Sequence, residues 1–541
     1  MHLRKRWPGI ALIALLLCHL PGTADDAPPL TSAQEALVRQ ALCGATGERG
    51  TALAELAKLS GSPAQIRRVE AIIRGGRTFE AIKDKRFTVT VALGDDRQLG
   101  VQLLLPADYD PAKRYPLMIA MGGGPTANEK QAKAQALMMV GGWSKPAQEA
   151  GWIIAAIEDT VSVRKPGKEL RYPILHADHL RPILGAVRAR VAIDPDRVYA
   201  TGISLGSNYA LAYAAAHPDW FAGIAPVSTE GESREFVLRN LNRVSVFTLE
   251  GAKDKNIRSI DGPRAMAKIL DRLGQRHRYE EEPNQGHEGF FAKYPAVLQW
   301  LANQPRQPFP REVIRLAHAG IILPGKRFYW IEADTHQAAF QASVRGNVIT
   351  VQAARVRRLT FHLSDRLLDL DEPVVVRVNG QTVHEKKVQR SVRVALEDAV
   401  ALDDTERFAT ARVTVEVPDL AAGEKWLAGL APEVQPGLLA FWEDYAVTTL
   451  KESRSKFPAE LEPVTIPSLP AGCVALKVKA APADGLVRAD DLLVEFDGEP
   501  FFAVAESAAF LRDYLWRTRG KMVHLKVLRG GEMKDVMVPL E

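Results

Sequence analysis

Cysteine is scarce in this sequence, with 3 among 541 residues. Cys18 lies in an apolar segment near the N-terminus, while Cys43 and Cys473 are separated by most of the chain. Their positions give no support for a disulfide, so the fold must depend on its apolar cores. Long apolar runs are also missing, because no stretch after the N-terminal segment approaches the ~20 residues that cross a bilayer. We therefore expect no membrane span.

The first 24 residues are typical of an export signal. Basic residues at positions 4–6 precede an apolar segment at 10–18, and small residues at 22–24 suit a cleavage site. Because the apolar segment is too short to span a bilayer, we expect cleavage and an exported protein, periplasmic or secreted. Cleavage lowers the formal net charge from +5 to +2. A value so close to neutral gives no indication of a nucleic-acid partner.

The length predicts about three domains. Residues 25–84 have helical periodicity and predict a small helical lead-in. From 85 to 308 strands and helices alternate, which predicts an α/β domain with a mainly parallel sheet. Short strands with turn signals at residues 309–420 predict a β-sandwich. We expect a helical connector at 421–466 and a small α+β unit at 467–541.

The strongest motif is Gly-Ile-Ser-Leu-Gly at residues 202–206, with Ser204 at its centre. A predicted strand at 198–200 precedes it, and a predicted helix at 207–216 follows it. This strand–turn–helix context is that of a nucleophile elbow, where side chains at the flanking glycines would clash with neighbouring backbone. Ser204 is therefore the candidate nucleophile.

The sequence IDPDRVY at residues 193–199 precedes this elbow. It resembles the corresponding segment of prolyl-oligopeptidase-like enzymes and of feruloyl and polyhydroxybutyrate esterases. With the elbow, it gives residues 85–303 a resemblance to the α/β-hydrolase superfamily. The resemblance implies a catalytic triad in the chain order serine, acid, histidine.

Two loops further along the chain resemble the loops that carry the acid and the base in this family. Asp254 ends the sequence Gly-Ala-Lys-Asp after a predicted strand at 244–249. Glu250 stands where the family often has histidine, and it is a rival for the role of the acid. His287 lies in a Gly-His sequence after a predicted strand at 278–282, where the family places its base. The resemblance thus implies a triad of Ser204, Asp254 and His287.

The strand at residues 117–121 and the glycines after it resemble the family's oxyanion-hole loop. The resemblance implies that the main-chain N–H groups of Gly123 and Leu205 stabilise the developing oxyanion. Met121 stands where the family has a histidine that braces the loop. This departure affects the rigidity of the loop and leaves its main-chain donor in place.

The sequence gives little indication of a metal or a cofactor. His176 and His179, with Asp178 between them, could act as ligands, but no further ligand motif accompanies them. We expect no metal and no cofactor.

The last unit resembles a bacterial PDZ domain. Residues 486–498, with the sequence LVRADDLLVEFDG, match the family's GL-x-x-G-D-x-I-x-x-x-D-G run, although Ala489 stands where glycine is usual. The resemblance implies a peptide-binding strand that starts at Gly472, Cys473 and Val474, and a groove helix at 505–516. The expected partner is a peptide C-terminus. The alternative is a degenerate module that binds nothing.

These observations favour an exported serine hydrolase that cleaves carboxylic esters, of small molecules or of polymers, through an acyl-enzyme. A peptidase of the prolyl-oligopeptidase type is one alternative, although no β-propeller precedes the catalytic region. A catalytically inactive protein that binds through its PDZ-like domain is another.

Overall fold

A computed structural model describes most of the chain between residues 29 and 539. The residues outside its description are 1–28, 45, 60, 95–96, 125–127, 159, 166–167, 174–176, 258, 318–324, 431–459, 471–472, 481–485, 503–521 and 540–541. The predicted export signal, most of the predicted connector, Gly472, His176 and the predicted groove helix therefore lie outside the described residues. Within the described ranges, no helix has both the length and the apolar character required to cross a bilayer.

Three helices form the N-terminal lead-in, namely α1 (Ser32–Cys43), α2 (Thr46–Leu56) and α3 (Pro63–Gly75). Their starts follow from local sequence. Thr31 and Gln34 form a capping box at α1, and Ser62 caps α3 just before its first residue, proline. The apolar faces of these helices share one buried cluster with α10 (Val392–Leu402), a helix more than 300 residues further along the chain.

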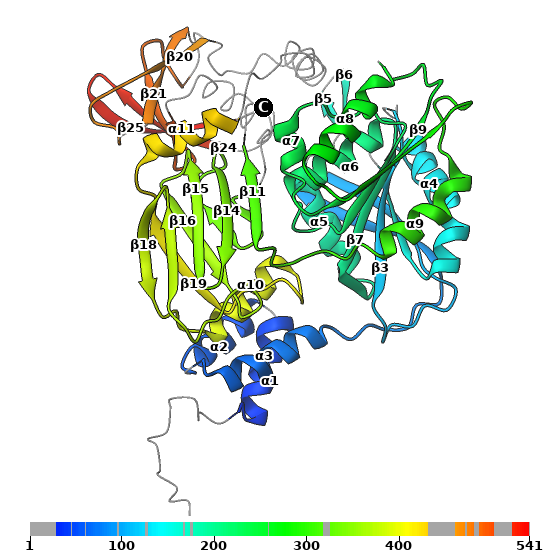
Figure 1. Ribbon diagram of the computed structural model, residues 1–541, viewed down its shortest axis with the longest axis horizontal. Helices are drawn as coiled ribbons and strands as arrows, with labels where there is room; N and C mark the ends of the chain where they lie inside the picture. The colour runs from blue at the N-terminus through cyan, green and yellow to red at the C-terminus, as the bar shows by residue number, and fades with distance from the viewer. Residues whose placement is uncertain are drawn as a thin grey trace, which may run out of the picture.

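An eight-stranded mixed sheet forms the central domain, on the right in Figure 1. Its strand order is β1-β2-β4-β3-β7-β8-β9-β10, and β2 is antiparallel to both neighbours while the later pairs are parallel. The strands are β1 (Arg86–Gly94), β2 (Arg97–Leu104), β3 (Tyr115–Met121), β4 (Ile153–Ile157), β7 (Ile193–Ile203), β8 (Gly223–Val227), β9 (Ser245–Gly251) and β10 (His277–Glu282). A separate hairpin consists of β5 (Thr160–Lys165) and β6 (Lys168–Pro173).

Helices cover both faces of this sheet (Figure 1). Alternate side chains of β3 enter different buried clusters, Ile119 on one face and Met118 on the other. The helices on the face of Ile119 are α5 (Ala177–Arg188), α6 (Leu205–Ala216), α7 (Glu235–Arg239) and α8 (Asp261–Arg272). Those on the face of Met118 are α4 (Glu129–Ala150) and α9 (Tyr294–Ala302), which follows the short helix η1 (Phe291–Lys293). The continuous burial of β3 and β8 agrees with a sheet that is covered twice.

Two further sheets follow and share one buried cluster. One contains β11 (Glu312–Leu316), β14 (Ala339–Arg345), β15 (Val348–Ala354), β17 (Val374–Val378) and β18 (Gln381–Lys386). The other contains β12 (Arg327–Phe328), β13 (Ile331–Ala333), β16 (Arg358–Leu363) and β19 (Ala411–Glu416). The helix α10 is an element that the sequence analysis did not expect. The β-sandwich remains our interpretation of this pair of sheets.

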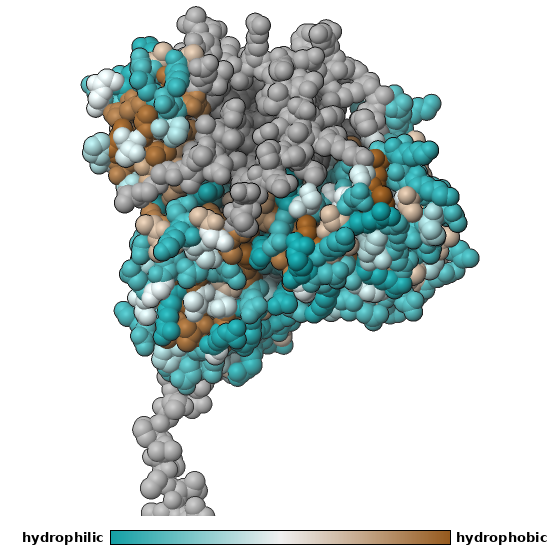
Figure 2. Space-filling model, turned by 45° about the horizontal axis from the view of Figure 1, so that its top comes forward, coloured by the Kyte–Doolittle hydropathy of each residue, from teal (hydrophilic) through white to brown (hydrophobic). Residues whose placement is uncertain are grey.

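A six-stranded sheet ends the described chain, after α11 (Leu420–Leu430). Its order is β20-β21-β23-β22-β24-β25, with β20 (Glu460–Val464), β21 (Cys473–Ala480), β22 (Leu492–Phe496), β23 (Glu499–Phe502), β24 (Met522–Arg529) and β25 (Glu532–Pro539). Figure 2 shows hydrophobic side chains on this unit, at the upper left, and Met522, Met533 and Met537 are exposed. The PDZ-like character of the unit stays a prediction.

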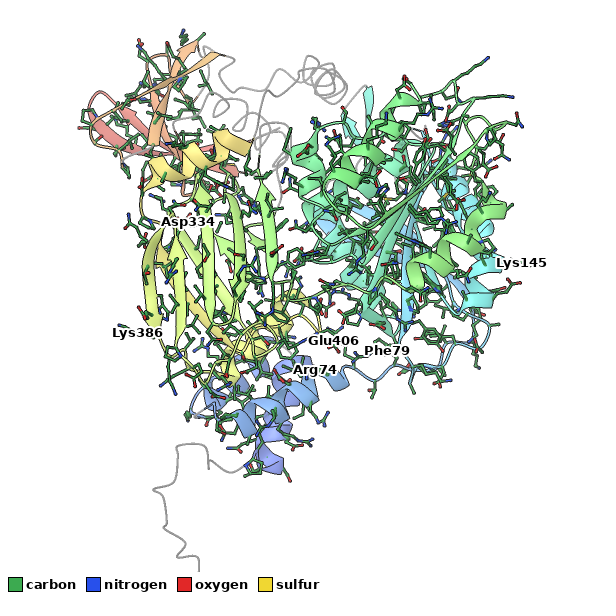
Figure 3. The ribbon with its side chains drawn as sticks, viewed as in Figure 1. Arg74, Phe79, Lys145, Asp334, Lys386 and Glu406 are labelled. Carbon is green, nitrogen blue, oxygen red and sulfur yellow. The ribbon has the colours of Figure 1, made fainter. Side chains whose placement is uncertain are left out.

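Buried ion pairs join the central domain to the unit that follows it. Arg306, in the linker, contacts Asp196 at the start of β7 (2.8 Å) and Asp404 just after α10 (2.7 Å). Its side chain is 1% exposed. Arg74 Nε of α3 lies 3.6 Å from Oε2 of Glu406, and both residues are labelled in Figure 3.

Candidate active site

Ser204 lies in the sharp turn between β7 and α6. Its backbone has φ 56° and ψ −120°, in the left-handed half of the map that residues with a side chain rarely adopt. The N–H of Ser204 donates to the carbonyl oxygen of Val227 in the neighbouring strand β8, at 2.9 Å. The turn thus holds Ser204 at the carboxyl end of the sheet, where open α/β sheets carry their sites.

The glycines on either side of Ser204 are required by the packing of this turn. A Cβ atom at Gly202 would lie 2.1 Å from the main-chain carbon of Gly206. A Cβ atom at Gly206 would lie 2.4 Å from the oxygen of Gly122 and 2.5 Å from that of Met121. Since all of these are backbone atoms, no side-chain rotation could relieve the clash. The steric reason that we gave for the motif is therefore present in the structure.

The two residues expected to stabilise an oxyanion lie on either side of Ser204. Leu205 is the first residue of α6, where main-chain N–H groups have no partner within the helix. Gly123 approaches the turn closely, because a Cβ atom built on it would lie 3.0 Å from that of Ser204. Met121 is fully buried at the end of β3, in the position where the family has histidine. The glycine loop therefore lies against Ser204 and follows a buried methionine.

Asp254 and His287 lie next to each other. The Nδ1–H group of His287 donates to Oδ2 of Asp254, at 2.7 Å. The second carboxylate oxygen, Oδ1, accepts from the main-chain N–H of Asn256 at 2.8 Å. The Asp254 side chain has no exposed surface, and that of His287 is 19% exposed. This is the arrangement in which a buried carboxylate selects one tautomer of an imidazole and orients it.

Glu250, the rival acid, takes a different position. It is fully buried at the end of β9, and its Oε1 accepts from the main-chain N–H of Thr229 at 2.8 Å. Its Oε2 is buried without a hydrogen-bond partner among the described residues. Burial raises the pKa of Glu250 to about 9, with a further increase from the nearby charge of Asp254, so the group is protonated at neutral pH. The structure pairs His287 with Asp254 and not with Glu250.

The sequence analysis missed Ser228, which connects the nucleophile turn with the histidine loop. Ser228 has φ 49°, its N–H donates to the oxygen of Leu249 in β9, and its hydroxyl donates to the oxygen of Glu288 at 2.9 Å. In the same loop, a Cβ atom at Gly289 would lie 3.2 Å from the side chain of Ile203. The loop that carries His287 therefore lies against the turn that carries Ser204. The available sequence signal for Ser228 was its position as a polar residue directly after the buried strand β8.

Of the two histidines considered as metal ligands, only His179 belongs to the part of the chain that the structure describes. His179 is buried in α5, and His176 lies outside the described residues. Across the described part of the chain, there is no group of three or more His, Cys, Asp or Glu side chains that could hold a metal ion.

Comparison with known proteins agrees with the chemistry of this site. Residues 92–311 match the family described as "Putative esterase". A stretch of 156 residues is 31% identical to the "Putative esterase NocK" of Nocardia uniformis subsp. tsuyamanensis. This stretch is 28% of the present chain and 43% of the relative's length. The family and the relative are both described as esterases, and these matches support an ester-hydrolysing enzyme.

Solved structures with similarity to this chain include esterases and peptidases. A thermostable esterase gives a TM-score of 0.33 at 18% identity, over 41% of this chain and 64% of its own. Dipeptidyl peptidase 4 of Porphyromonas gingivalis gives 0.32 at 12% identity, over 40% of this chain and 35% of its own. Because these TM-scores are low, the functional proposal rests on the family match and on the local geometry of the site.

Proposed function

We propose that this protein is an exported serine hydrolase of the α/β-hydrolase type that cleaves carboxylic esters. Ser204 is the nucleophile, His287 the base and Asp254 the orienting acid. The observation that carries the proposal is the 2.7 Å hydrogen bond between His287 and buried Asp254, in a loop that lies against the Ser204 turn. A serine at its ordinary pKa is a weak nucleophile, and a histidine oriented in this way makes it reactive.

The reaction follows from these roles. His287 Nε2 accepts the hydroxyl proton as Ser204 Oγ bonds to the ester carbonyl carbon, and the carbonyl oxygen becomes an oxyanion. The main-chain N–H groups of Gly123 and Leu205 stabilise that charge. The tetrahedral intermediate expels the alkoxide, which takes the proton from His287, and an acyl-enzyme remains. Water, deprotonated by His287, then releases the carboxylic acid and restores Ser204.

Labelling with a fluorophosphonate tests this proposal directly, because the reagent reacts only with an activated serine. We expect the protein to be labelled and Ser204→Ala to remain unlabelled, with ester hydrolysis reduced by about 10⁴-fold or more. Labelled protein would next be assayed with p-nitrophenyl esters of increasing acyl length and with prolyl and alanyl peptide anilides. If the anilides were cleaved faster than the esters, the protein would be assigned as a peptidase instead of an esterase. If the native protein were not labelled, a non-catalytic binding protein would be the better assignment.

Two neighbouring acids provide a matched test of the triad. Asp254→Asn leaves the geometry in place but allows the wrong tautomer of His287, so we expect kcat to fall by about 10⁴-fold. Glu250→Gln replaces a protonated acid by a neutral amide of the same shape, so we expect activity within about tenfold of native. Ester hydrolysis at pH 7.5 measures both. Equal losses in the two variants would contradict the assignment of the acid.

We also propose that the last sheet is a PDZ-like module that binds a peptide C-terminus. Cys473 and Val474 pair with Phe502 and Phe501 of β23 on one edge of β21, and the pairing with β20 begins at Ala475. An added peptide strand beside the first two residues is the expected mode of binding. Fluorescence anisotropy with a library of peptides that carry free or amidated C-termini tests this proposal. Equal binding of both forms would contradict it.

A further inference from the structure

A cavity of about 530 Å³ lies where the helical lead-in, α5 and the end of α10 meet. In Figure 1 the lead-in and α10 lie below the two-sheet unit, and α5 belongs to the neighbouring central domain. Ser204, Asp254 and His287 do not line this cavity. The volume lies within the roughly 300–1,000 Å³ of small-molecule sites. The cavity is therefore a candidate binding site separate from the proposed catalytic one.

Four arginines line the cavity, and two of them belong to α5. Arg181 donates to the carbonyl oxygen of Ala401, and Nη1 of Arg188 donates to that of Asp403 at 2.8 Å. Neither arginine forms an ion pair with a carboxylate of the described residues. Arg77 does so, because its Nη2 lies 2.8 Å from Oδ1 of Asp403. An arginine side chain has five N–H donors, and Arg181 and Arg188 each use one of them in these hydrogen bonds. Most of their donors therefore have no acceptor among these contacts.

The fourth arginine, Arg49, is held in the same way. Its Nη2 donates to the carbonyl oxygen of Gly44 at 3.3 Å, and its Nε is buried without a partner among the described residues. It also forms no ion pair with a described carboxylate. A buried guanidinium N–H without an acceptor is costly, so a ligand that supplies an acceptor would be favoured.

The aspartates that line the cavity are already engaged. Asp403 pairs with Arg77, and Asp404 is buried in an ion pair with Arg306, at 2.7 Å. Burial lowers the pKa of Arg188, and the charges of Asp404 and Asp403 oppose that shift. With four arginines and two engaged aspartates in its lining, the cavity carries an excess of positive charge.

The remaining wall is largely apolar. Leu42 and Ile73 come from the lead-in, Leu184 from α5, Val400 and Leu402 from α10, and Trp220 from the loop after α6. An inorganic anion would leave this apolar surface uncovered. A ligand with an anionic end and an apolar body would satisfy both parts of the wall.

We propose that this cavity binds a small organic carboxylate with an apolar body. The carboxylate accepts hydrogen bonds from Arg49, Arg181 and Arg188, and the apolar body lies against Trp220 and Leu402. Guanidinium groups suit this task because their planar set of donors matches the two oxygens of a carboxylate. This assignment does not depend on the reaction at Ser204.

Isothermal titration of the full chain with 3-phenylpropionate, 3-phenylpropanol and 3-phenylpropylamine tests the proposal. The three probes share one apolar body and differ in the charge of the end group. We expect the carboxylate to bind at least tenfold more tightly than the alcohol, and the amine not to bind. The Ser204→Ala protein is titrated in parallel and should give the same affinity. Equal affinity for the acid and the alcohol, or no binding of the acid at millimolar concentration, would overturn the proposal.

Variants then locate the binding site. Arg181→Gln and Arg49→Gln remove a donor group at two separate walls, and each should weaken carboxylate binding by at least tenfold. Arg190→Gln is the matched control, because it makes the same change of charge just beyond α5 and outside the cavity, and it should bind as the native protein does. Thermal melting verifies that each variant is folded. Native-like affinity in both cavity variants would place the carboxylate elsewhere and refute the proposal.

Discussion

At the scale of single residues, Glu250 gives the clearest dependence on pH. Its pKa is about 9 in the folded protein, because of burial and the charge of Asp254, against 4.5 in the unfolded chain. Between these values the folded state holds a proton that the unfolded state has lost. The contribution of Glu250 to the free energy of unfolding is therefore complete below about pH 4.5, and it is lost progressively as the pH rises toward 9.

We accordingly predict that Glu250→Gln changes the pH profile of stability. The variant cannot lose this proton, so its melting temperature should exceed that of the native protein by a margin that grows from pH 5 to pH 9. Circular dichroism melts across this range measure the difference. Glu372→Gln, at an exposed carboxylate, serves as the control and should follow the native curve. Parallel curves for Glu250→Gln and native protein would show that Glu250 does not hold its proton.

The residues proposed for the site have local signals in the sequence. Ser204, Asp254 and His287 each stand in a short motif directly after a strand, and the motif order gave their expected roles. The partner of His287 was less certain, since Glu250 and Asp254 lie only four residues apart in sequence. The structure separates them, because the strand end directs Glu250 toward Thr229. Ser228 stood in no motif, and its contact with Glu288 depends on chain folding between distant loops.

At the scale of elements, the strand–turn–helix unit tolerates no side chain at its first glycine. We predict that Gly202→Ala destabilises the protein by about 3 kcal/mol, because the new methyl group meets the backbone of Gly206. The fraction of the variant that folds should also lose fluorophosphonate labelling, because the turn that carries Ser204 must shift to make room for the methyl group. Urea unfolding and labelling measure the two effects.

Gly141→Ala is the control for this change. A Cβ atom there, within α4, meets nothing within 4 Å, so alanine should stabilise the helix by about 0.5–1 kcal/mol. The elements differ in how far the sequence could predict them. The strands of the large sheet and the turn after β7 follow from local sequence patterns. The helix α10 was not expected, and its apolar face packs mainly against the lead-in, more than 300 residues earlier in the chain.

At the scale of the whole molecule, two buried charged groups hold the units together. Arg306 joins the central domain to the region after α10. Glu499, at the start of β23, joins the last sheet to the two-sheet unit. Its Oε1 contacts His336 at 2.6 Å and Lys326 at 2.8 Å, and its Oε2 accepts from the hydroxyl of Thr335 at 2.9 Å. Contacts between segments so distant in sequence have no local signal, and the sequence analysis expected neither.

Glu499 makes the attachment of the last sheet sensitive to acid. Burial alone would raise its pKa, but the hydrogen bond with His336 and the charges of His336 and Lys326 outweigh burial and lower the pKa to about 2. The folded state therefore keeps the carboxylate charged where the unfolded chain protonates. This stabilisation is complete above about pH 4.5 and is lost as the pH falls toward 2.

We predict that Glu499→Gln loosens the last sheet without affecting the site. The amide cannot pair with Lys326 and His336, so the contact should weaken by about 2 kcal/mol. Hydrogen exchange should accelerate in β21 and β23, while labelling at Ser204 stays native. Glu495→Gln removes a charge that pairs with Lys526 inside the same sheet, at 3.1 Å, and should leave exchange in β23 unchanged. If both variants accelerated exchange equally, the effect would come from the sheet itself, and Glu499 would not be its anchor.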